Sequence, residues 1–377
     1  MSSPDPFYKR IGFHSIFLYI SSLKTFVRVF ADKKTNIQKN RTMNRKKKSE
    51  ERSIKLGILF LFLCPVFLVS TAAAGEEEVL PVLSERLLKI SGYSQVQYTH
   101  WEGDSEDFRI RRARLGLKGS LLKNIDYSLQ VDAVRSPVLV DARVDITLFR
   151  QTKLSLGQFK VPFSPENLTP SSALDNVDRT QTVKKICPAQ DIGATGRDIG
   201  MTLSGKFSWI EYTFGVFNGS GINTRDTNDR KDMVGRLVVR PVHFLSVGVS
   251  HYEGVHSLFT GGPLLNRDRT GMDVFIAAGR LFLKGEYILA KDEGIDRAGW
   301  YVRGAYSFIR DKLQAVVNYD SYDIDIDLDE NRSDILTLGL NWFFTRNTKL
   351  QVNYEYQKQE WVETGDHVLL AQFQAGF

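Results

Sequence analysis

The chain has 377 residues, a formal net charge of +6 and a sequence pI of about 9.1, a balance that would suit a nucleic-acid-binding protein. The positive surplus is confined to residues 1–74, which hold 14 Lys and Arg and 4 Asp and Glu, out of 50 and 44 in the whole chain. The remaining residues therefore carry 36 basic and 40 acidic side chains. This net charge of −4 excludes nucleic acid as the expected partner.

Residues 43–74 have the features of a cleavable secretory signal. A basic stretch beginning at Met43 precedes an apolar segment over 56–69, and three alanines ending at Ala74 provide a cleavage site. A membrane anchor is the alternative, but the apolar segment is short, contains Pro65 and ends in small residues. We therefore expect export, with cleavage near Ala74.

Such signals begin at their initiator methionine, so residues 1–42 are expected to be an upstream extension from a mis-assigned translation start. Residues 75–87 then form a short amino-terminal segment before the body of the protein, 88–377. This body contains one cysteine, Cys187, which cannot form an internal disulfide. The sequence has no glycine-rich phosphate loop, zinc-ligand spacing or nucleophile motif, so no cofactor, metal or catalytic residue is expected.

From residue 88 onward the sequence divides into about sixteen segments of about 9 to 14 residues, many of which alternate apolar with polar residues. In 140–148, for example, every second residue is apolar and the intervening residues are Asp, Arg, Asp and Thr. Beyond the signal no apolar run approaches the ~18–20 residues of a spanning helix. The expected strands are 88–101, 108–120, 125–134, 138–150, 153–161, 197–206, 208–218, 232–240, 243–253, 270–279, 281–290, 298–309, 312–320, 332–345, 347–359 and 366–377.

The connections between these segments alternate in length. Two-residue connections such as 123–124 and 310–311 interleave with longer polar ones, which are 102–107, 162–196, 219–231, 254–269, 291–297, 321–331 and 360–365. This alternation is typical of an outer-membrane β-barrel, with short periplasmic turns and longer extracellular loops. Barrel closure also satisfies every backbone hydrogen bond, as lipid requires. The sequence therefore predicts an all-β fold, a transmembrane antiparallel β-barrel of about sixteen strands, in preference to a β-sandwich.

The final segment supports this prediction. Its apolar residues fall at 369, 371, 373, 375 and 377, so they share one face of a strand. The pattern resembles the closing strand of bacterial outer-membrane barrels, in which it serves as an assembly signal, here Phe373 and Phe377. Aromatic residues near other segment ends are expected to form interfacial girdles: Tyr98, Trp101, Tyr301, Tyr319, Trp342 and Tyr354.

The period of two also places the charged residues. If the apolar residues of the second segment face lipid, Arg112, Arg114 and Lys118 face the lumen, whereas Arg109 and Arg111 share the outer face near the rim. A row of permanently charged guanidinium groups attracts anions. The same parity turns other basic residues inward: Arg143, Arg236, Arg240, Lys284 and Arg303. The alternative is a structural network in which these side chains pair with lumen acids: Asp126, Asp132, Asp141, Asp145, Glu211 and Glu286.

Several motifs resemble the phosphate-selective porin O and P family. Residues 108–119 (FRIRRARLGLKG) and 127–132 (YSLQVD) resemble that family's second and third strands. Residues 156–166 (LGQFKVPFSPE) are similar to the segment that enters its constriction loop, and 198–201 and 215–221 to the strands beyond.

The resemblance covers 88–377 and implies a barrel of 16 strands, a homotrimer, basic residues lining the lumen and a third loop, 162–196, folded into it. Lys160 enters this loop, and Arg179, Lys184 and Lys185 lie within it. The family's phosphate sites also use arginines of a later loop, for which Arg225, Arg230 and Lys231 are the nearby candidates here, interleaved with Asp226, Asp229 and Asp232.

The expected function is that of an outer-membrane porin for small hydrophilic solutes, anion-preferring, with phosphate or polyphosphate implied by the resemblance. A general non-selective porin and a structural or adhesive barrel are the alternatives. An outer-membrane enzyme would need a Ser, a His and an acid on adjacent strands, and histidine is scarce. The expected partners are outer-membrane lipid and lipopolysaccharide, the barrel assembly machinery, other copies in a homotrimer and small anionic solutes. The expected location is the bacterial outer membrane.

Overall fold

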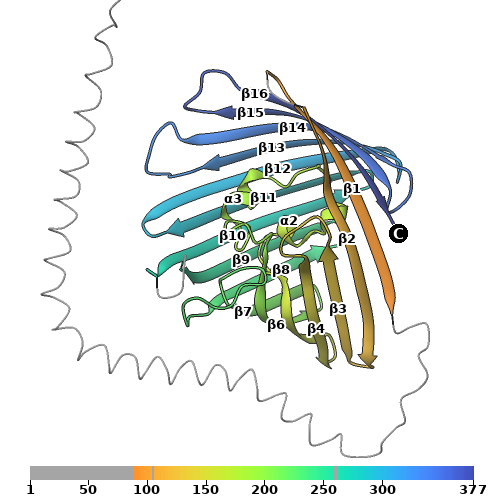
Figure 1. Cartoon of the computed structure of the whole chain (residues 1–377), viewed down its shortest axis with the longest axis vertical. Helices are drawn as coiled ribbons and strands as arrows, with labels where there is room; N and C mark the ends of the chain where they lie inside the picture. The colour runs from red at the N-terminus through yellow and green to blue at the C-terminus, as the bar shows by residue number, and fades with distance from the viewer. Residues whose placement is uncertain (1–87, 104–105, 258–261) are drawn as a thin grey trace, which may run out of the picture. The chain divides into compact units, whose positions relative to one another are not determined.

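The computed structural model describes residues 88–103, 106–257 and 262–377. The predicted upstream extension, signal and segment 75–87 lie outside the described residues. Sixteen strands form a closed barrel in which each strand pairs with its sequence neighbours and β1 (Lys89–Trp101) pairs with β16 (Asp366–Gly376) (Figure 1). All of these pairings are antiparallel, so the predicted barrel is confirmed.

The remaining strands follow in chain order: β2 (Glu106–Leu122), β3 (Ile125–Asp132), β4 (Leu139–Phe149), β5 (Thr152–Lys160), β6 (Arg197–Phe207), β7 (Ile210–Phe217), β8 (Asp232–Val242), β9 (Leu245–His256), β10 (Leu265–Ala278), β11 (Leu281–Asp292), β12 (Ile295–Ile309), β13 (Leu313–Asp323), β14 (Arg332–Phe343) and β15 (Lys349–Gln359).

The connections lie at two ends of the barrel. The turn end holds connections such as 123–124, 150–151 and 208–209, and the loop end holds longer ones such as 161–196 and 218–231. This matches the alternation expected from the sequence, with one exception.

The exception is the connection between β11 and β12. A long loop over 291–297 was expected, but Glu293 and Gly294 alone join the two strands. Their φ angles are 46° and 92°, both in the left-handed region, which is where a tight hairpin turn places its central residues. Gly294 adopts this conformation without steric cost. The expectation of a long loop was therefore wrong, because the local acidic and polar residues belong to the strand ends.

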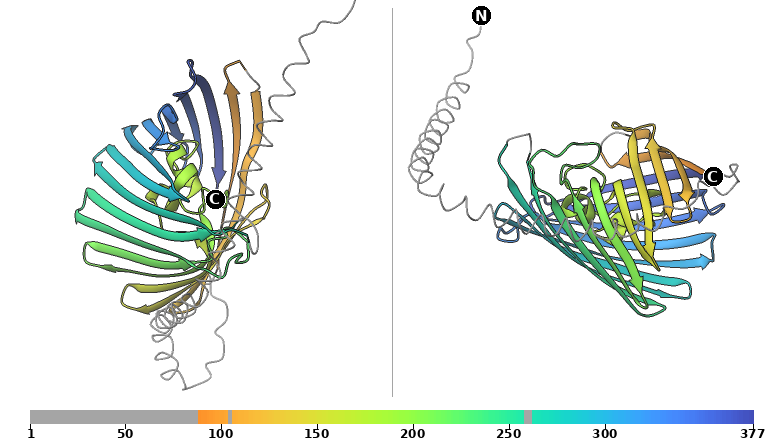
Figure 2. Two further views of the ribbon diagram at one scale, coloured as in Figure 1. Left: turned by 90° about the vertical axis from the view of Figure 1, so that its left-hand side faces the viewer. Right: turned by 90° about the horizontal axis from the view of Figure 1, so that it is seen from below.

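The segment between β5 and β6 folds into the barrel (Figures 1 and 2). It contains α2 (Pro165–Leu168), the 3₁₀ helix η2 (Ser171–Ala173) and α3 (Gln181–Ile186). Its apolar side chains pack with inward side chains of the wall in one buried cluster, which includes Phe163, Val183, Ile186, Cys187, Phe217, Tyr252, Ile288 and Tyr301. The expected inserted loop is thus present, and we call residues 161–196 the inner loop.

The two faces of the wall have opposite chemistry. Outward side chains such as Leu115, Val317 and Leu338 are apolar and exposed, while lumen side chains such as Gln95 and Asn353 are polar and covered. The outside is therefore suited to lipid and the inside to water. Among residues 88–103, 106–257 and 262–377, no helix combines the length and the apolar character needed to cross a bilayer.

Aromatic side chains gather on the outer surface at the turn end. Trp342 stacks on Phe344 with ring centroids 6.2 Å apart, and Phe344 lies 6.1 Å from Phe373. Tyr301, expected in a girdle, is 1% exposed and faces the lumen, where its hydroxyl donates to Glu286 Oε1 at 2.6 Å. That expectation was wrong because Tyr301 has the inward parity of β12.

Candidate functional site: a basic path through the lumen

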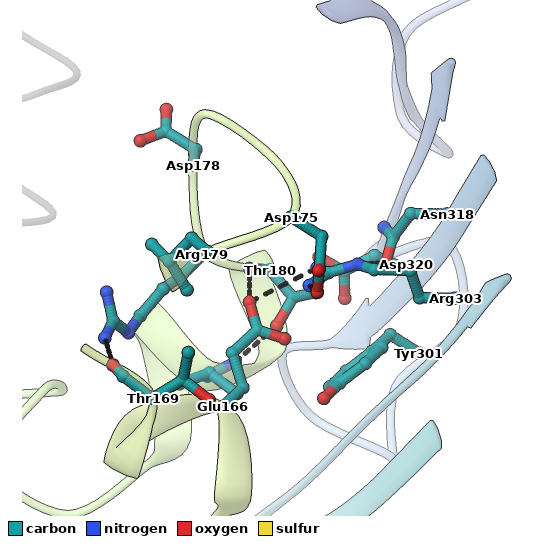
Figure 3. Close-up of polar contacts among 12 residues, drawn as sticks. Glu166, Thr169, Asp175, Asp178, Arg179, Thr180, Tyr301, Arg303, Asn318 and Asp320 are labelled. Carbon is teal, nitrogen blue, oxygen red and sulfur yellow. Dashed lines mark hydrogen bonds and ion pairs between the residues drawn. The ribbon is translucent and has the colours of Figure 1, made fainter. Parts of the chain in front are cut away.

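The inner loop is attached to the wall by buried charged groups (Figure 3). Glu166 in α2 accepts a hydrogen bond from the Thr180 backbone amide at 2.9 Å, and its carboxylate lies 3.3 Å from Arg303 Nη2 of β12. Burial alone would raise the pKa of Glu166, but Arg303 and Lys284 outweigh burial and lower it. Glu166 is therefore held as a carboxylate that fixes α2 to β12.

The start of α3 is attached to the neighbouring strand. Asp320 of β13 accepts hydrogen bonds from the backbone amides of Gln181 and Thr182 and from Thr182 Oγ1, the last at 2.6 Å. The four first amides of a helix lack intrahelical partners, so a buried carboxylate satisfies them well.

The middle of the loop is held by β14 and β15. Lys349 Nζ donates to Leu174 O at 2.8 Å, and Asn341 Nδ2 and Gln351 Nε2 donate to Asp175 O at 2.8 and 3.0 Å. The loop therefore lies against the β11–β15 side of the lumen.

Open space remains on the other side, as two cavities. The basic cavity, at the loop end, has a volume of 330 Å³, and the turn-end cavity has a volume of 490 Å³. Both are lined by Arg114, Ser171 and Arg197. These three residues therefore mark the junction between the cavities, with Ser171 on the inner loop and the two arginines on the wall.

Both cavities are strongly basic. One acidic side chain, Asp178, lines the basic cavity, and one, Asp141, lines the turn-end cavity. Eight basic residues line the basic cavity: Arg109, Arg111, Arg112, Arg114, Arg135, Arg179, Lys184 and Arg197. Five line the turn-end cavity: Arg114, Lys118, Arg143, Lys160 and Arg197.

Arg111 faces the lumen, although strand parity placed it outside. The pairing of β1 with β2 shifts register between Gln95 and Val96, which leaves Arg111 as an extra residue of β2. Such a bulge redirects a side chain. Arg111 Nη1 donates to Gln97 Oε1 at 2.6 Å, and its guanidinium pairs with Asp178 of the inner loop. Arg109 lines the basic cavity as well, while Phe108 and Ile110 on either side of it are exposed on the outside. The outward placement of Arg109 and Arg111 was wrong because the bulge reverses the parity of the residues before it.

Arg112 and Arg114 lie side by side on the path but differ in their partners. Arg112 Nη1 donates to Gln95 Oε1 at 2.7 Å and has no ion pair within the described part of the chain. Arg114 Nε lies 2.9 Å from Asp132 Oδ2, and its Nη1 lies 3.4 Å from Ser171 Oγ. The charge of Arg112 is thus less compensated than that of Arg114.

Lys160 and Arg179 converge on the end of α2, and Figure 3 shows the contact of Arg179 with Thr169. Lys160 Nζ donates to the carbonyls of Asn167, Leu168 and Thr169 at 2.7, 3.3 and 2.6 Å. Arg179 Nη2 donates to Thr169 O at 2.5 Å and to Asn167 O at 3.4 Å. No carboxylate among the described residues forms an ion pair with either cation.

Other predicted residues line the same path with different partners. Lys118 lines the turn-end cavity without a hydrogen bond or ion pair to a described residue. Arg143 lies 2.9 Å from Asp145 Oδ2. Lys184 of α3 lies 3.6 Å from Asp178 Oδ2.

The remaining predicted cations lie away from the two basic cavities. Arg236 is buried and bonds both carboxylate oxygens of Asp273, at 2.6 and 3.1 Å. Arg240 pairs with Glu211 near the turn end, and Arg303 is buried against Glu166. For these three arginines the contacts fit the alternative to an anion path, a structural network in which basic side chains pair with acids inside the barrel. Lys284 likewise pairs with Asp175.

A third cavity of 400 Å³ opens at the loop end beside β13–β15. Its charges balance, with Arg179, Lys184 and Lys185 against Asp178, Asp320 and Glu355. This third cavity shares no lining residue with the turn-end cavity, whereas the basic cavity shares three. Of the two cavities at the loop end, the basic cavity is therefore the one that continues toward the turn end.

Two arginines of the path were not anticipated. Arg197, the first residue of β6, bonds Asp141 through Nε at 2.8 Å and Nη2 at 3.2 Å. Arg135 lies in the 133–138 connection. In the sequence, both appear simply as basic residues at the edge of a loop. The alternation of inward and outward side chains applies within a strand, so it could not place either of them in the lumen.

Phe377 closes the barrel. Its backbone N–H donates to Gly92 O at 2.9 Å, and Gly92 N donates to Phe377 O at 3.2 Å. The rings of Phe373 and Phe377 are exposed on the outside. Gly92 has no side chain to meet the Phe377 ring, which lies 2.8 Å from where a Cβ would stand.

Solved porin structures share this fold. An anion-selective porin from Comamonas acidovorans has a TM-score of 0.59 and 17% identity, and the match covers 77% of this chain and 99% of that one. OmpT of Vibrio cholerae in its trimer form has a TM-score of 0.57 and 11% identity, covering 76% and 99%. The outer membrane channel DcaP of Acinetobacter baumannii gives 0.57 and 10%, covering 79% and 100%. No curated protein matches the chain.

The family evidence comes from the sequence. The family described as phosphate-selective porin O and P matches residues 91–255 and 251–377. Fold and family together point to a channel rather than to an enzyme. The chain belongs to the phosphate-selective porin O and P family and is a porin of the bacterial outer membrane.

Proposed function

We propose that this porin prefers anions and conducts them along one side of its lumen, from the basic cavity past Arg114, Ser171 and Arg197 into the turn-end cavity. The observation that carries the proposal is the charge of the lining. One acidic residue faces eight basic residues in the basic cavity, and one faces five in the turn-end cavity.

The mechanism is electrodiffusion through water. Low-dielectric walls focus the field of the lining cations, which raises the local concentration of anions and lowers that of cations. Guanidinium groups keep their charge at any physiological pH and present forked donors to oxyanions. Arg112 and Lys118 contribute strongly, because neither forms an ion pair with a carboxylate of the described residues. Phosphate, polyphosphate and small organic anions fit this chemistry.

The test is the reversal potential of purified protein in a planar bilayer across a potassium chloride gradient. Anion preference gives the potential the sign of chloride permeation. A potential near zero would indicate a general non-selective porin, and an absence of channels would favour a structural or adhesive barrel. Block of the chloride current by added inorganic phosphate would extend the proposal to phosphate.

We also propose that the protein forms homotrimers. The supporting observation is the fold shared with OmpT, whose solved structure is described as a trimer form. Chemical cross-linking in mild detergent should give bands of two and three chains. A purely monomeric sample that still conducts would reject the trimer alone.

We propose that the turn end faces the periplasm and that the signal is cleaved after Ala74, as the A-x-A sequence indicates. Amino-terminal sequencing of protein from outer membranes should then begin at Gly75. A mature protein that retains residues before 75 would contradict this cleavage.

A further inference from the structure

The junction between the basic cavity and the turn-end cavity is formed by the barrel wall on one side and by the inner loop on the other. Ser171 forms the loop side of the junction, opposite Arg114 and Arg197. It is the first residue of η2 and lies two residues after Thr169. The position of the 167–169 turn therefore controls where Ser171 stands.

Lys160 and Arg179 hold this turn. An ammonium group has three N–H donors, and Lys160 places its Nζ within 3.3 Å of three carbonyl oxygens, those of residues 167–169. Arg179 reaches two of the same oxygens from the other side of the loop. Carbonyls at the end of a helix have no intrahelical partners, and hydrogen bonds from charged donors are stronger than neutral ones.

The segment that follows the turn is held at its other end as well. Gln374 Nε2 donates to Ser172 O at 3.3 Å, and Lys349 Nζ donates to Leu174 O at 2.8 Å. Residues 170–174 are thus held at both ends. Lys160 and Arg179 bond the end of α2 that precedes them, and Lys349 of β15 and Gln374 of β16 bond their own carbonyl groups. Two long contacts also reach Ser171 itself, from Arg114 Nη1 to its Oγ and from Gln95 Nε2 to its O, each at 3.4 Å. We expect release of either end of the segment to let Ser171 move away from the arginines despite these two contacts.

We propose that Lys160 and Arg179 are positioning residues that set the width of the path by holding the 167–169 turn. They act through the loop and not as ligands of the passing solute. This inference rests on the proposed function, because it assumes that solutes pass from the basic cavity to the turn-end cavity. It differs from the expectation that Lys160 attracts anions directly, since its donors are already used by carbonyls.

The test separates width from charge by using neutral solutes. Liposome swelling with sugars of increasing size measures the size limit of the pore, and neutral sugars do not respond to the charge of the lining. Lys160→Met removes the donors but keeps the length of the side chain. We expect this variant to admit the larger sugars several-fold faster than the wild type, and Lys160→Arg to retain the wild-type limit.

Lys118→Met is the matched comparison, because it removes one cation from the turn-end cavity without touching the inner loop. It should reduce anion preference in reversal potentials while its size limit stays at the wild-type value. An unchanged size limit in Lys160→Met would overturn the proposal, and a shift in reversal potential equal to that of Lys118→Met would then make Lys160 a solute-facing cation.

Arg179→Met provides a second route to the same answer, should Lys160→Met fail to fold. It removes the other donor to Thr169 and should also admit larger sugars. Correct folding of each variant is checked by its heat-dependent mobility on gels. Absence of anion preference in the wild type would reject the proposed function, whereas the comparison of size limits judges the role of Lys160 and Arg179 independently.

Discussion

At the scale of single residues, the lumen cations differ in whether a carboxylate compensates them. Arg236 and Arg303 each have a buried acid beside them, whereas Arg112 bonds the neutral amide of Gln95 and forms no ion pair with any residue that the structure describes. A cation ~4 Å from a passing anion contributes about 1 kcal/mol in water-like surroundings, about a fivefold change in local anion population. Uncompensated cations on the path should therefore dominate selectivity.

Arg112→Ala should lower the anion-to-cation permeability ratio by up to about fivefold, because it removes from the basic cavity a charge that no described carboxylate pairs with. Reversal potentials in a salt gradient measure this ratio. Arg240→Ala is the control, since it removes the same charge from a residue that is paired with Glu211 and lies outside both basic cavities. Equal effects of the two substitutions would mean that total lumen charge, and not position, sets selectivity.

Glu166 makes the attachment of the inner loop dependent on pH. Its pKa in the folded protein is lowered from its ordinary value of 4.5, because Arg303 and Lys284 outweigh burial. A carboxyl group with a lowered pKa stabilises the folded state above its ordinary value, and this contribution is lost as the pH falls through the folded value. We expect channel current to become noisier as the pH falls from 4.5 through the lower folded value, because α2 then detaches.

Arg303→Met should move this acid transition to higher pH, because burial raises the pKa of Glu166 and Arg303 is the strongest of the groups that lower it. Removal of one partner of a buried ion pair costs about 3–5 kcal/mol, so the melting temperature should also fall. Arg236→Met breaks a similar buried pair, but this pair joins two strands of the wall, because Asp273 bonds Arg236 through both carboxylate oxygens. This control should melt earlier yet keep the acid transition in its current traces. A transition at the wild-type pH in Arg303→Met would contradict the role of Glu166.

At the scale of elements, local pattern predicted the sixteen strands because alternation and turns are local properties. It failed where geometry departs from a regular strand, at the Arg111 bulge and at the Glu293-Gly294 turn. It also could not supply the contacts of the inner loop. Val177 N donates to Asn353 Oδ1 across 176 residues of sequence, and no local pattern encodes such a pair.

The packing of α3 against β12 can be tested at Gly299. A Cβ at this position would lie 2.7 Å from Thr182 Cγ2, so Gly299→Ala should push α3 from the wall and weaken the bond between Thr182 and Asp320. Overpacking of this kind costs about 1–3 kcal/mol. Thermal unfolding should show the loss, and single-channel current should become noisier.

Gly304→Ala is the control on the same strand, because its Cβ would have no neighbour closer than 3.9 Å. It should leave both melting and current at wild-type values. If Gly299→Ala behaves like Gly304→Ala, α3 is not packed tightly against β12.

At the scale of the whole molecule, net charge does not indicate what the lumen attracts. The residues after the leader carry a net charge of −4, yet the open path is basic. Many acids lie elsewhere, either paired in the wall or exposed in loops such as 324–331, which contains Asp325, Asp327, Asp329 and Glu330. Selectivity is therefore a matter of where each charge stands, which follows from barrel closure and the inner loop together.

Closure of the barrel depends on the last strand, and a substitution of Phe377 can distinguish an effect on assembly from an effect on stability. The bonds between Gly92 and residue 377 use backbone atoms, and the Phe377 ring is 71% exposed on the outer face. Phe377→Ala should thus change the unfolding free energy of protein refolded into lipid by no more than about 0.5 kcal/mol. If the ring serves as an assembly signal, the amount of protein in outer-membrane fractions should nevertheless fall strongly.

Phe344→Ala is the control, because it removes an exposed girdle ring outside the last strand, and it should leave that amount near the wild-type level. A parallel loss of stability and amount in Phe377→Ala would instead show that the ring acts by holding the closed barrel together.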